Sequence, residues 1–287
     1  MIVAPLWWCE NGYNTTMPNL TLIKFGGSTI TDKHQPETPN LPIIAQLAAE
    51  LQAVRAQQPT LPLLIGHGSG SFGHTYAAQY GVHTGLSDTA DWRGYALTGA
   101  AAGRLNRIVV DTLLAAGVPA LAVQPSASLR CERGVVVQWH TATLDLALAR
   151  GLVPVIYGDV AFDLVQGSAI ASTEALFTYL VSRTELVPAR IILVGETAVY
   201  TADPYLNPHA ERVPLITTAN IDTVLAGAAG SRAVDVTGGM RSKLQLMWQL
   251  IEAVPSLQVH LITAERGALR RALLDADADL GTRMRLH

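Results

Sequence analysis

Short apolar runs alternate along the chain with longer segments in which apolar residues recur at helical spacing. The run at 20–25 is followed by a helical pattern over 43–54, and a second apolar run covers 61–65. Both runs end in glycine-bearing turns. The repeated order of strand, glycine turn and helix predicts a mainly parallel sheet with helices on both faces. In such sheets ligands bind outside the carboxyl ends of the strands, where these turns lie.

The same periodicity predicts further elements downstream. We expect strands at 119–123, 152–157, 190–194 and 257–262, and a hairpin over 128–138 that turns near 132–134. Helices are expected at 93–116, 174–182, 243–253 and 267–275. Because Met17 lies just before the first strand, residues 1–18 are expected to be a disordered or non-native extension. No repeat or linker divides the remainder, so 19–287 is predicted to be one domain.

Composition excludes several classes of protein. The chain has 287 residues, of which 49% are hydrophobic and 15% charged, with a net charge of -3, which argues against disorder and against a broad basic surface for nucleic acid. The longest charge-free apolar region, 112–129, is interrupted by glycine and proline, so no membrane span is predicted. Cys9 and Cys131 cannot build a disulfide framework or a tetrahedral zinc site. A cytoplasmic protein without a resident metal fits best.

Lysine is scarce in this chain. Of the 20 basic residues only three are lysines, Lys24, Lys33 and Lys243, and each lies beside a glycine-rich or turn-rich segment. A compact ammonium group on a flexible stem suits phosphate. Three ordinary surface lysines are the alternative, which their positions make less favourable.

Two glycine turns follow the first two predicted strands. The first reads Lys24-Phe25-Gly26-Gly27-Ser28, and the second reads His67-Gly68-Ser69-Gly70-Ser71-Phe72-Gly73-His74 just before a predicted helix. Small residues leave backbone N–H groups bare, and a helix N-terminus attracts an anion. We expect His74 to project from the first turn of that helix toward the anion, whereas His67 is interpreted as a buried histidine bonded to backbone.

Two later turns extend the pattern. Tyr157-Gly158-Asp159-Val160 ends a strand and by itself indicates only a turn, whereas the segment from Asp235 to Lys243 places two glycines before a helix that carries a lysine. Its spacing is not that of a Walker motif, and no dinucleotide-binding G-x-G-x-x-G follows the first strand. The glycines and lysines therefore favour phosphoryl transfer on another scaffold.

These segments together resemble the amino acid kinase superfamily. The resemblance rests on the Lys-Phe-Gly-Gly-Ser start, the Tyr-Gly-Asp turn, Asp203-Pro204 and the Asp-Val-Thr-Gly-Gly-Met segment, with Gly281-Thr282 similar to a closing strand. Gly70-Ser71-Phe72-Gly73-His74 is similar to the loop of the isopentenyl phosphate kinases. The resemblance implies an open αβα sandwich, a homodimer, and ATP with Mg²⁺ as the phosphoryl donor to isopentenyl phosphate.

The resemblance also implies roles for individual residues. Its acceptor-binding half would span about 19–185 and its nucleotide-binding half about 186–287. Lys24, Lys33, His74 and Lys243 would be catalytic, with Lys33 bridging the transferring group. The ATP site would consist of Lys24, Gly26, Gly27, Ser28, Gly70, Gly195, Gly238 and Lys243. The acceptor site would consist of Gly68, Ser69, His74, Gly158 and Thr173.

Two departures from the family pattern leave alternatives open. Ser172-Thr173-Glu174 keeps a carboxylate but loses a glycine, and 194–200 lacks two aspartates of the usual nucleotide-side segment. A kinase of a fosfomycin-like phosphonate or of carbamate, and a non-catalytic nucleotide-binding storage or regulatory protein, remain alternatives. The stretch Gly99 to Gly103, with 92–98 before it, is a candidate lining for an apolar tail. Close helix packing on the sheet is the favoured explanation for its small residues.

Overall fold

The structure is a computed structural model that describes residues 20–182, 188–195, 198–202, 207–228 and 239–287. An eight-stranded sheet forms its centre, in the order β10-β12-β11-β9-β1-β2-β6-β3. All neighbouring pairs in it are parallel except β11 and β12. Its strands are β1 (Thr21–Phe25), β2 (Leu63–His67), β3 (Ala120–Ala122), β6 (Val153–Tyr157), β9 (Arg190–Gly195), β10 (Leu215–Ile216), β11 (Gln258–Thr263) and β12 (Thr282–Met284).

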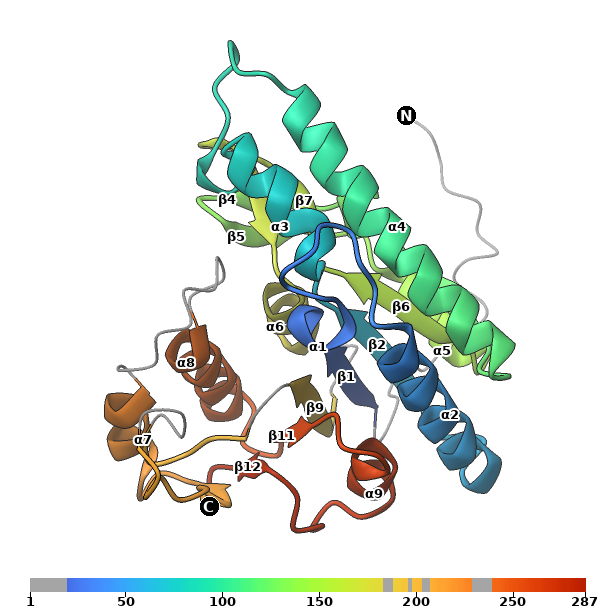
Figure 1. Ribbon diagram of the computed structural model, residues 1–287, viewed down its shortest axis with the longest axis vertical. Helices are drawn as coiled ribbons and strands as arrows, with labels where there is room; N and C mark the ends of the chain where they lie inside the picture. The colour runs from blue at the N-terminus through green and yellow to red at the C-terminus, as the bar shows by residue number, and fades with distance from the viewer. Residues whose placement is uncertain (1–19, 183–187, 196–197, 203–206, 229–238) are drawn as a thin grey trace, which may run out of the picture.

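Helices cover both faces of this sheet, which confirms the expected open αβα sandwich (Figure 1). They are α1 (Gly27–Ile30), α2 (Leu41–Gln57), α3 (Gly70–Gln79), α4 (Arg93–Ala115), α5 (Ala142–Ala149), α6 (Thr173–Val181), α7 (Ile221–Gly227), α8 (Gly239–Ala253) and α9 (Ala268–Leu274). Alternate residues of β1 point to opposite faces. Ile23 packs with α2, α4 and α9, whereas Leu22 packs with α5, α6 and α8. The sheet therefore separates two apolar cores.

Strand β1 lies in the middle of the sheet, between β2 and β9. Phe25, its last residue, is level with His67 at the end of β2 and with Val194 near the end of β9. The carboxyl ends of three adjacent strands thus lie at one edge. The two glycine turns predicted from the sequence start from this edge.

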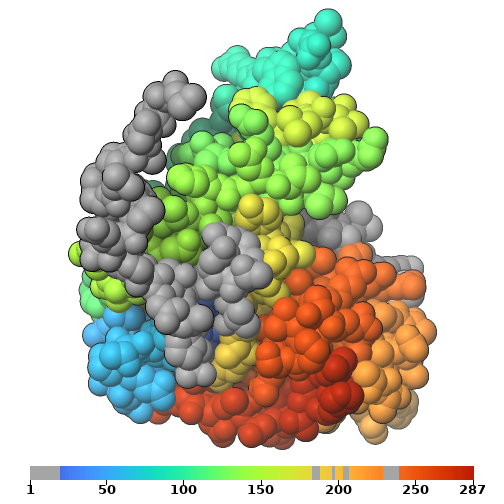
Figure 2. Space-filling model, turned by 180° about the vertical axis from the view of Figure 1, so that it is seen from behind, coloured from blue at the N-terminus to red at the C-terminus, as the bar shows by residue number. Residues whose placement is uncertain are grey.

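A smaller sheet lies at one end of the molecule, seen in green and yellow above the red C-terminal segments in Figure 2. It has the order β5-β4-β7-β8 and consists of β4 (Arg130–Glu132), β5 (Val135–Gln138), β7 (Asp159–Asp163) and β8 (Gly167–Ala171). The buried carboxylate of Asp163 accepts four backbone N–H bonds, two from the turn between β4 and β5 and two from the turn between β7 and β8. One side chain therefore joins two hairpins.

The structure agrees with most elements predicted from the sequence and adds some. The helix predicted at 93–116 is α4, and the predicted hairpin is β4 and β5. The second strand begins two residues later than the apolar run, at Leu63. The sequence did not predict β7 and β8 as a hairpin. No helix of the described residues is long and apolar enough to cross a membrane.

The predicted extension at 1–18 lies outside the described residues. The division into acceptor-binding and nucleotide-binding halves stays a prediction. The large sheet takes strands from both sides of the proposed boundary, because β1 pairs with β9.

Glu50 joins two helices that are far apart in the sequence. This buried carboxylate of α2 accepts hydrogen bonds from the backbone nitrogens of Gly267, at 2.8 Å, and Arg270, at 3.0 Å, at the start of α9. A helix N-terminus leaves its first N–H groups without intrahelical acceptors. Glu50 supplies acceptors for two of them from across the fold.

We predict that Glu50→Ala destabilises the protein by about 1–3 kcal/mol, because two N–H groups at the start of α9 lose the buried carboxylate that accepts their hydrogen bonds. Equilibrium unfolding in urea measures the difference. The control is Gln57→Ala on the same helix, whose exposed amide bonds only the Ala53 carbonyl of its own helix. Equal stability of both variants would contradict the role assigned to Glu50.

Candidate active site

The glycine turns after β1 and β2 contact each other through their backbones. A Cβ atom placed on Gly27 would lie 2.6 Å from the Gly70 nitrogen, and one placed on Gly68 would lie 3.0 Å from the Gly27 nitrogen. The Gly68 N–H donates to the Phe25 carbonyl at 3.1 Å. Neither position has room for a side chain. The predicted ATP residues Gly27 and Gly70 are therefore brought together, beside the predicted acceptor residue Gly68.

Gly70 begins α3 in a left-handed conformation, with φ at +49°. The Thr31 hydroxyl group occupies the space where a Gly70 side chain would lie, and it donates to the Gly27 carbonyl at 2.7 Å. The same hydroxyl accepts the Ser71 N–H at 3.1 Å. Thr31, which the sequence did not single out, thus joins the two glycine turns.

The turn after β9 lies against the first glycine turn. Gly26 donates its N–H to the Val194 carbonyl at 2.8 Å, and a Cβ on Gly26 would lie 3.6 Å from the Gly195 Cα. The predicted ATP residues Gly26 and Gly195 are therefore adjacent. Bare backbone from three strands meets at this edge of the sheet, as an anionic ligand requires.

The carbonyl group of His67 brings together two predicted acceptor residues. It accepts the Gly158 N–H at 2.9 Å and the Thr173 hydroxyl at 2.7 Å. Thr173 is the first residue of α6, and Gly158 lies between β6 and β7. These two segments and the second glycine turn thus meet at one oxygen atom.

The His67 side chain is fully buried and neutral. Burial lowers its pKa to about 4. Its Nδ1 lies 3.0 Å from the Gly68 carbonyl and its Nε2 lies 3.1 Å from the Asn106 amide of α4, so Nδ1 carries the proton and donates, while Nε2 accepts from Asn106. The ring also stacks on Tyr157 at 5.7 Å. This agrees with the interpretation of His67 as a histidine bonded to backbone.

Two of the three lysines act on one buried carboxylate. The Lys24 ammonium lies 2.7 Å from Glu174 Oε1. Burial alone would raise the pKa of Glu174, but the positive charges of Lys24 and Lys243 outweigh it and hold that pKa below its ordinary value. Glu174 therefore pairs directly with the lysine of β1 and also lies in the electrostatic field of the lysine of α8.

Other predicted residues have individual positions near this edge. His74 is half-buried and is the fifth residue of α3, so it begins the second helical turn rather than lying in the first, as the sequence had suggested. Ser69 is buried directly before α3, and Ser28 is exposed on α1. Lys33 is exposed on the loop between α1 and α2. Gly238, 196–197 and Asp203-Pro204 lie outside the described residues.

Two buried hydroxyl groups in the glycine turns have no hydrogen-bond partner among the described residues. They belong to Thr29, beside Gly26, and to Ser71, in the turn after β2. Buried polar groups are usually paired. Both hydroxyls are available to an oxygen-rich ligand. Thr29 was not singled out by the sequence analysis, whereas Ser71 belongs to the second glycine turn that it identified.

The small residues of α4 pack closely on the strands, as the sequence analysis favoured. A Cβ on Gly99 would lie 3.0 Å from Val160 Cγ2, and one on Gly103 would lie 3.6 Å from the Tyr157 hydroxyl. The neighbouring carboxyl group of Asp159 is buried, which raises its pKa to about 6, although N–H bonds from Ser126 and Val160 oppose the shift.

The described residues do not fit a metal centre built by the protein. They contain no group of three or more His, Cys, Asp or Glu side chains placed to hold a metal ion. Glu174, the buried carboxylate at the glycine turns, is already paired with Lys24. A Mg²⁺ ion in such a site binds chiefly through substrate phosphates.

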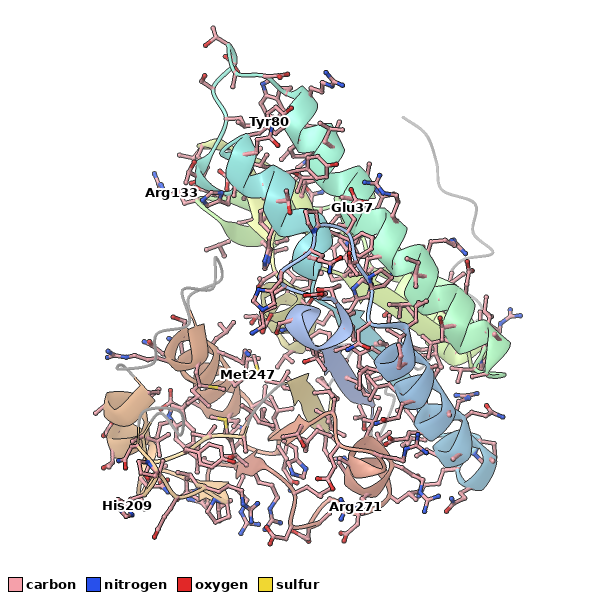
Figure 3. The ribbon with its side chains drawn as sticks, in the orientation of Figure 1. Glu37, Tyr80, Arg133, His209, Met247 and Arg271 are labelled. Carbon is pink, nitrogen blue, oxygen red and sulfur yellow. The ribbon has the colours of Figure 1, made fainter. Side chains whose placement is uncertain are left out.

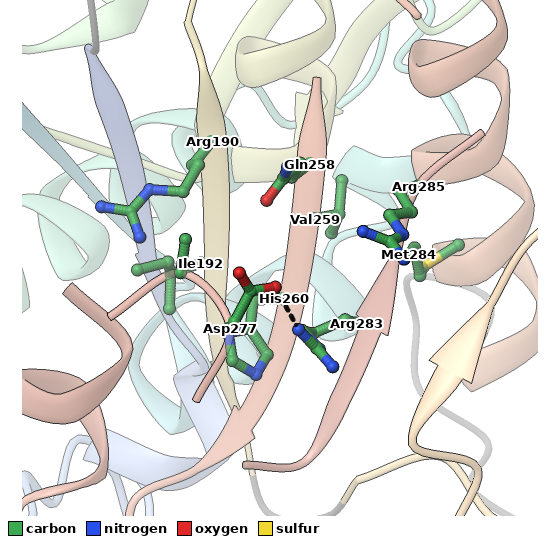
Figure 4. Close-up of a pocket in the computed structure, with 10 residues that line it drawn as sticks. Arg190, Ile192, Gln258, Val259, His260, Asp277, Arg283, Met284 and Arg285 are labelled. Atoms are coloured by element: carbon green, nitrogen blue, oxygen red, sulfur yellow. Dashed lines mark hydrogen bonds and ion pairs between the residues drawn. The ribbon is translucent and has the colours of Figure 1, made fainter. Parts of the chain in front are cut away.

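A pocket at the opposite edge of the sheet does not belong to this site. It is lined by Arg190, His260, Asp277 and Arg283, among others, near the amino ends of β9 and β11 (Figure 4). Arg190 donates to the Ala272 and Leu273 carbonyls at the end of α9, and Arg283 pairs with Asp277. The charged groups that line this pocket therefore hold the C-terminal segment in place through hydrogen bonds and an ion pair.

The fold and the glycine-and-lysine site define a phosphotransferase class, and comparison with known proteins agrees. The model of the amino acid kinase family matches residues 19–262, and the chain belongs to that family. Several of its relatives there are isopentenyl phosphate kinases. The one from Methanothermobacter thermautotrophicus is 33% identical over 92% of this chain and 98% of its own, and the one from Haloferax volcanii is 35% identical over 81% and 88%.

A solved structure of an isopentenyl phosphate kinase has the same fold. It superposes with a TM-score of 0.77 at 31% identity, covering 93% of this chain and all of its own. The resemblance inferred from the motifs is thereby confirmed for the family and for its kinase class.

We predict that Glu174→Gln lowers the free energy of unfolding by about 3 kcal/mol at pH 7, because it leaves Lys24, whose side chain is only 12% exposed, without its counter-charge. The folded-state pKa of Glu174 is lowered, so its contribution is complete above the unfolded value of about 4.3 and is lost as the pH falls through the folded value. Urea unfolding at several pH values measures both effects.

Glu265→Gln, at an exposed position, is the matched control and should change stability little at any pH. A Glu174→Gln difference that does not diminish toward acid would mean that the carboxylate charge is not what stabilises this region.

Proposed function

We propose that the protein transfers the γ-phosphoryl group of ATP to isopentenyl phosphate, giving isopentenyl diphosphate. The observation that carries the proposal is the meeting of three bare turns, Lys24, Glu174 and the charge of Lys243 at one sheet edge, in a chain whose relatives include isopentenyl phosphate kinases along nearly its whole length. This reaction brings two polyanions together. It therefore requires positive charge near their phosphates and backbone N–H groups that can approach those phosphates closely.

On the donor side, Gly26, Gly27 and Gly195 would present backbone to the ATP phosphates, together with Ser28, Gly70 and Gly238. Lys24 and Lys243 would neutralise charge on the moving phosphoryl group. Glu174 would orient both ammonium groups, because they share its field. Lys33 would bridge donor and acceptor from its loop.

On the acceptor side, Gly68, Ser69, Gly158 and Thr173 would surround the phosphate of the substrate. That phosphate oxygen is already an anion, so no general base is needed to make it nucleophilic. His74 on α3 would donate a hydrogen bond to it. Rate enhancement then comes from positioning and from charge on a loose transition state.

The apolar tail would lie beyond the acceptor phosphate, next to a small apolar cluster. Val82, Leu86 and Val160 are buried there, with Trp92 and Tyr95 of the segment before Gly99 packed against them. Val160 is two residues beyond Gly158, which we propose contacts the acceptor phosphate. An apolar wall of this kind favours a prenyl group over a polar acceptor.

Further expectations accompany this function. Mg²⁺ would arrive with ATP and neutralise phosphate charge, without a cage of protein ligands. We also propose a cytoplasmic homodimer, as the family resemblance implies. Phosphonate or carbamate kinases and a non-catalytic nucleotide-binding protein are the alternatives, and acceptor chemistry separates them.

The test is an ADP-release assay on the purified protein with ATP and Mg²⁺. The acceptors are isopentenyl phosphate, dimethylallyl phosphate, fosfomycin, carbamate, glutamate and UMP. The proposal expects the highest kcat/KM with isopentenyl phosphate. A preference for fosfomycin or carbamate would transfer the assignment to that acceptor, and ATP binding without ADP release would support the regulatory alternative.

We predict that His74→Ala lowers kcat for isopentenyl phosphate about a hundredfold, the cost typical of one lost donor to transition-state charge. ATP affinity, measured by calorimetry, should survive. The control is His209→Ala, at an exposed position far from the glycine turns (Figure 3). Near-normal turnover of the His74 variant would remove the proposed hydrogen bond.

We predict that Lys243→Met weakens ATP binding about tenfold to a hundredfold, because a charge-assisted contact to phosphate is lost. Calorimetric titration with a non-hydrolysable ATP analogue measures the dissociation constant. Arg271→Met, exposed on α9, removes a cation elsewhere and should leave the constant unchanged. An unchanged constant in the Lys243 variant would place the nucleotide away from α8.

A further inference from the structure

The loop between α1 and α2 is closed at its base and carries Lys33. Asp32 donates its N–H to the Thr38 carbonyl at 2.9 Å, and Thr31 and Pro39 form an isolated antiparallel bridge. Asp32 also accepts the His34 N–H at 2.8 Å, which turns the chain directly around Lys33. We call residues 32–38 the lysine loop. These hydrogen bonds fix the base of the lysine loop. The direction in which the loop points therefore depends on the contacts that its other residues make.

The C-terminal part of the lysine loop is held in place through Glu37, which Figure 3 labels. The Arg104 guanidinium of α4 donates through Nε to Glu37 Oε2 at 2.8 Å and through a second nitrogen to Oε1. The Arg104 guanidinium and the Tyr76 hydroxyl of α3 both lower the pKa of this carboxylate. The Glu37 N–H donates to the Ser71 carbonyl at 3.3 Å.

Glu37 has a left-handed backbone conformation, with φ at +48°, although it is not glycine. Such a conformation persists in a non-glycine residue when surrounding contacts determine it. The two-pronged pair with Arg104 is such a contact, because the planar fork of arginine fixes both distance and direction.

Helix α4 connects Arg104 to the candidate active site. Two residues along the helix, Asn106 bonds His67 at the base of the second glycine turn. Nearer its start, Gly94 lies directly against the Tyr80 side chain at the end of α3. The helix that receives the lysine loop is thus packed against the helix of His74 and bonded to the turn that would hold the acceptor phosphate.

We propose that Glu37 and Arg104 are positioning residues, whose pair fixes the lysine loop on α4 and so places the Lys33 ammonium over the reacting phosphates. The inference rests on the proposed function, since it takes Lys33 as the bridging group. Both side chains are partly exposed, at 26% for Glu37 and 50% for Arg104. Exposed pairs contribute little to global stability, so loss of this pair acts on the placement of the loop and leaves the fold intact.

The test compares Arg104→Met and Glu37→Gln with wild type in the isopentenyl phosphate assay. We expect kcat to fall about tenfold to a hundredfold, because misplacement of a charged group by about 1 Å has that cost. KM for ATP and the melting temperature should change little. The control is Arg107→Met, which removes the Arg107–Asp111 pair from the same helix one turn further on and should leave kcat unchanged.

The same substitution in a Lys33→Met background separates positioning from other effects. If the pair acts through Lys33, Arg104→Met lowers kcat no further once Lys33 is absent. An equal loss in both backgrounds, or a kcat for Arg104→Met equal to that of Arg107→Met, overturns the inference. Wild-type turnover by Lys33→Met alone overturns it too, by removing the bridging role.

Hydrogen–deuterium exchange of 32–38 tests the loop without any assay of activity. The inference expects faster exchange in Arg104→Met than in Arg107→Met, and equal exchange overturns it. Absence of turnover by the wild-type protein would instead mean that the proposed function is wrong, an outcome distinct from unchanged exchange in the loop.

Discussion

The site depends on one close contact, the backbone of the turn after β1 against the backbone of the turn after β2. Adjacent parallel strands lie about 4.8 Å apart, and there is no room between their ends for side chains at Gly27 and Gly68. Because this contact excludes side chains, N–H groups from neighbouring strands face the same volume. Helices α1 and α3 both begin there, so the start of each helix is fixed by the contact.

The electrostatics of the glycine turns depend on one buried carboxylate, that of Glu174. Lys24 ends a central strand and Lys243 lies on a helix of the other half of the chain, and two such cations would repel each other without a counter-charge. Glu174, at the start of α6, lies in the field of both. Its burial strengthens the interaction, and it also makes removal of the carboxylate costly.

Sequence alone predicted the strands and long helices because their apolar periods are local, as at β1 and α4. It identified the glycine turns because a run of small residues directly before a helix is typical of an anion-binding turn. It missed the β7–β8 hairpin, because that sheet depends on Asp163 accepting N–H groups from two separate turns. The contacts of Thr31, Asn106 and Glu174 were also not predicted, since each one joins segments that are far apart in the sequence and depends on how they pack. Gly238 is outside the described residues.

The central place of β1 has a consequence for biosynthesis. One of its two neighbours, β2, follows within forty-odd residues, but the other, β9, begins only at Arg190. At ribosomal speeds of about 5–20 residues per second, one flank of β1 waits on the order of ten seconds for its partner. During that interval an apolar edge strand is open to foreign β-strands. The nascent chain is therefore most vulnerable to aggregation before its C-terminal third emerges.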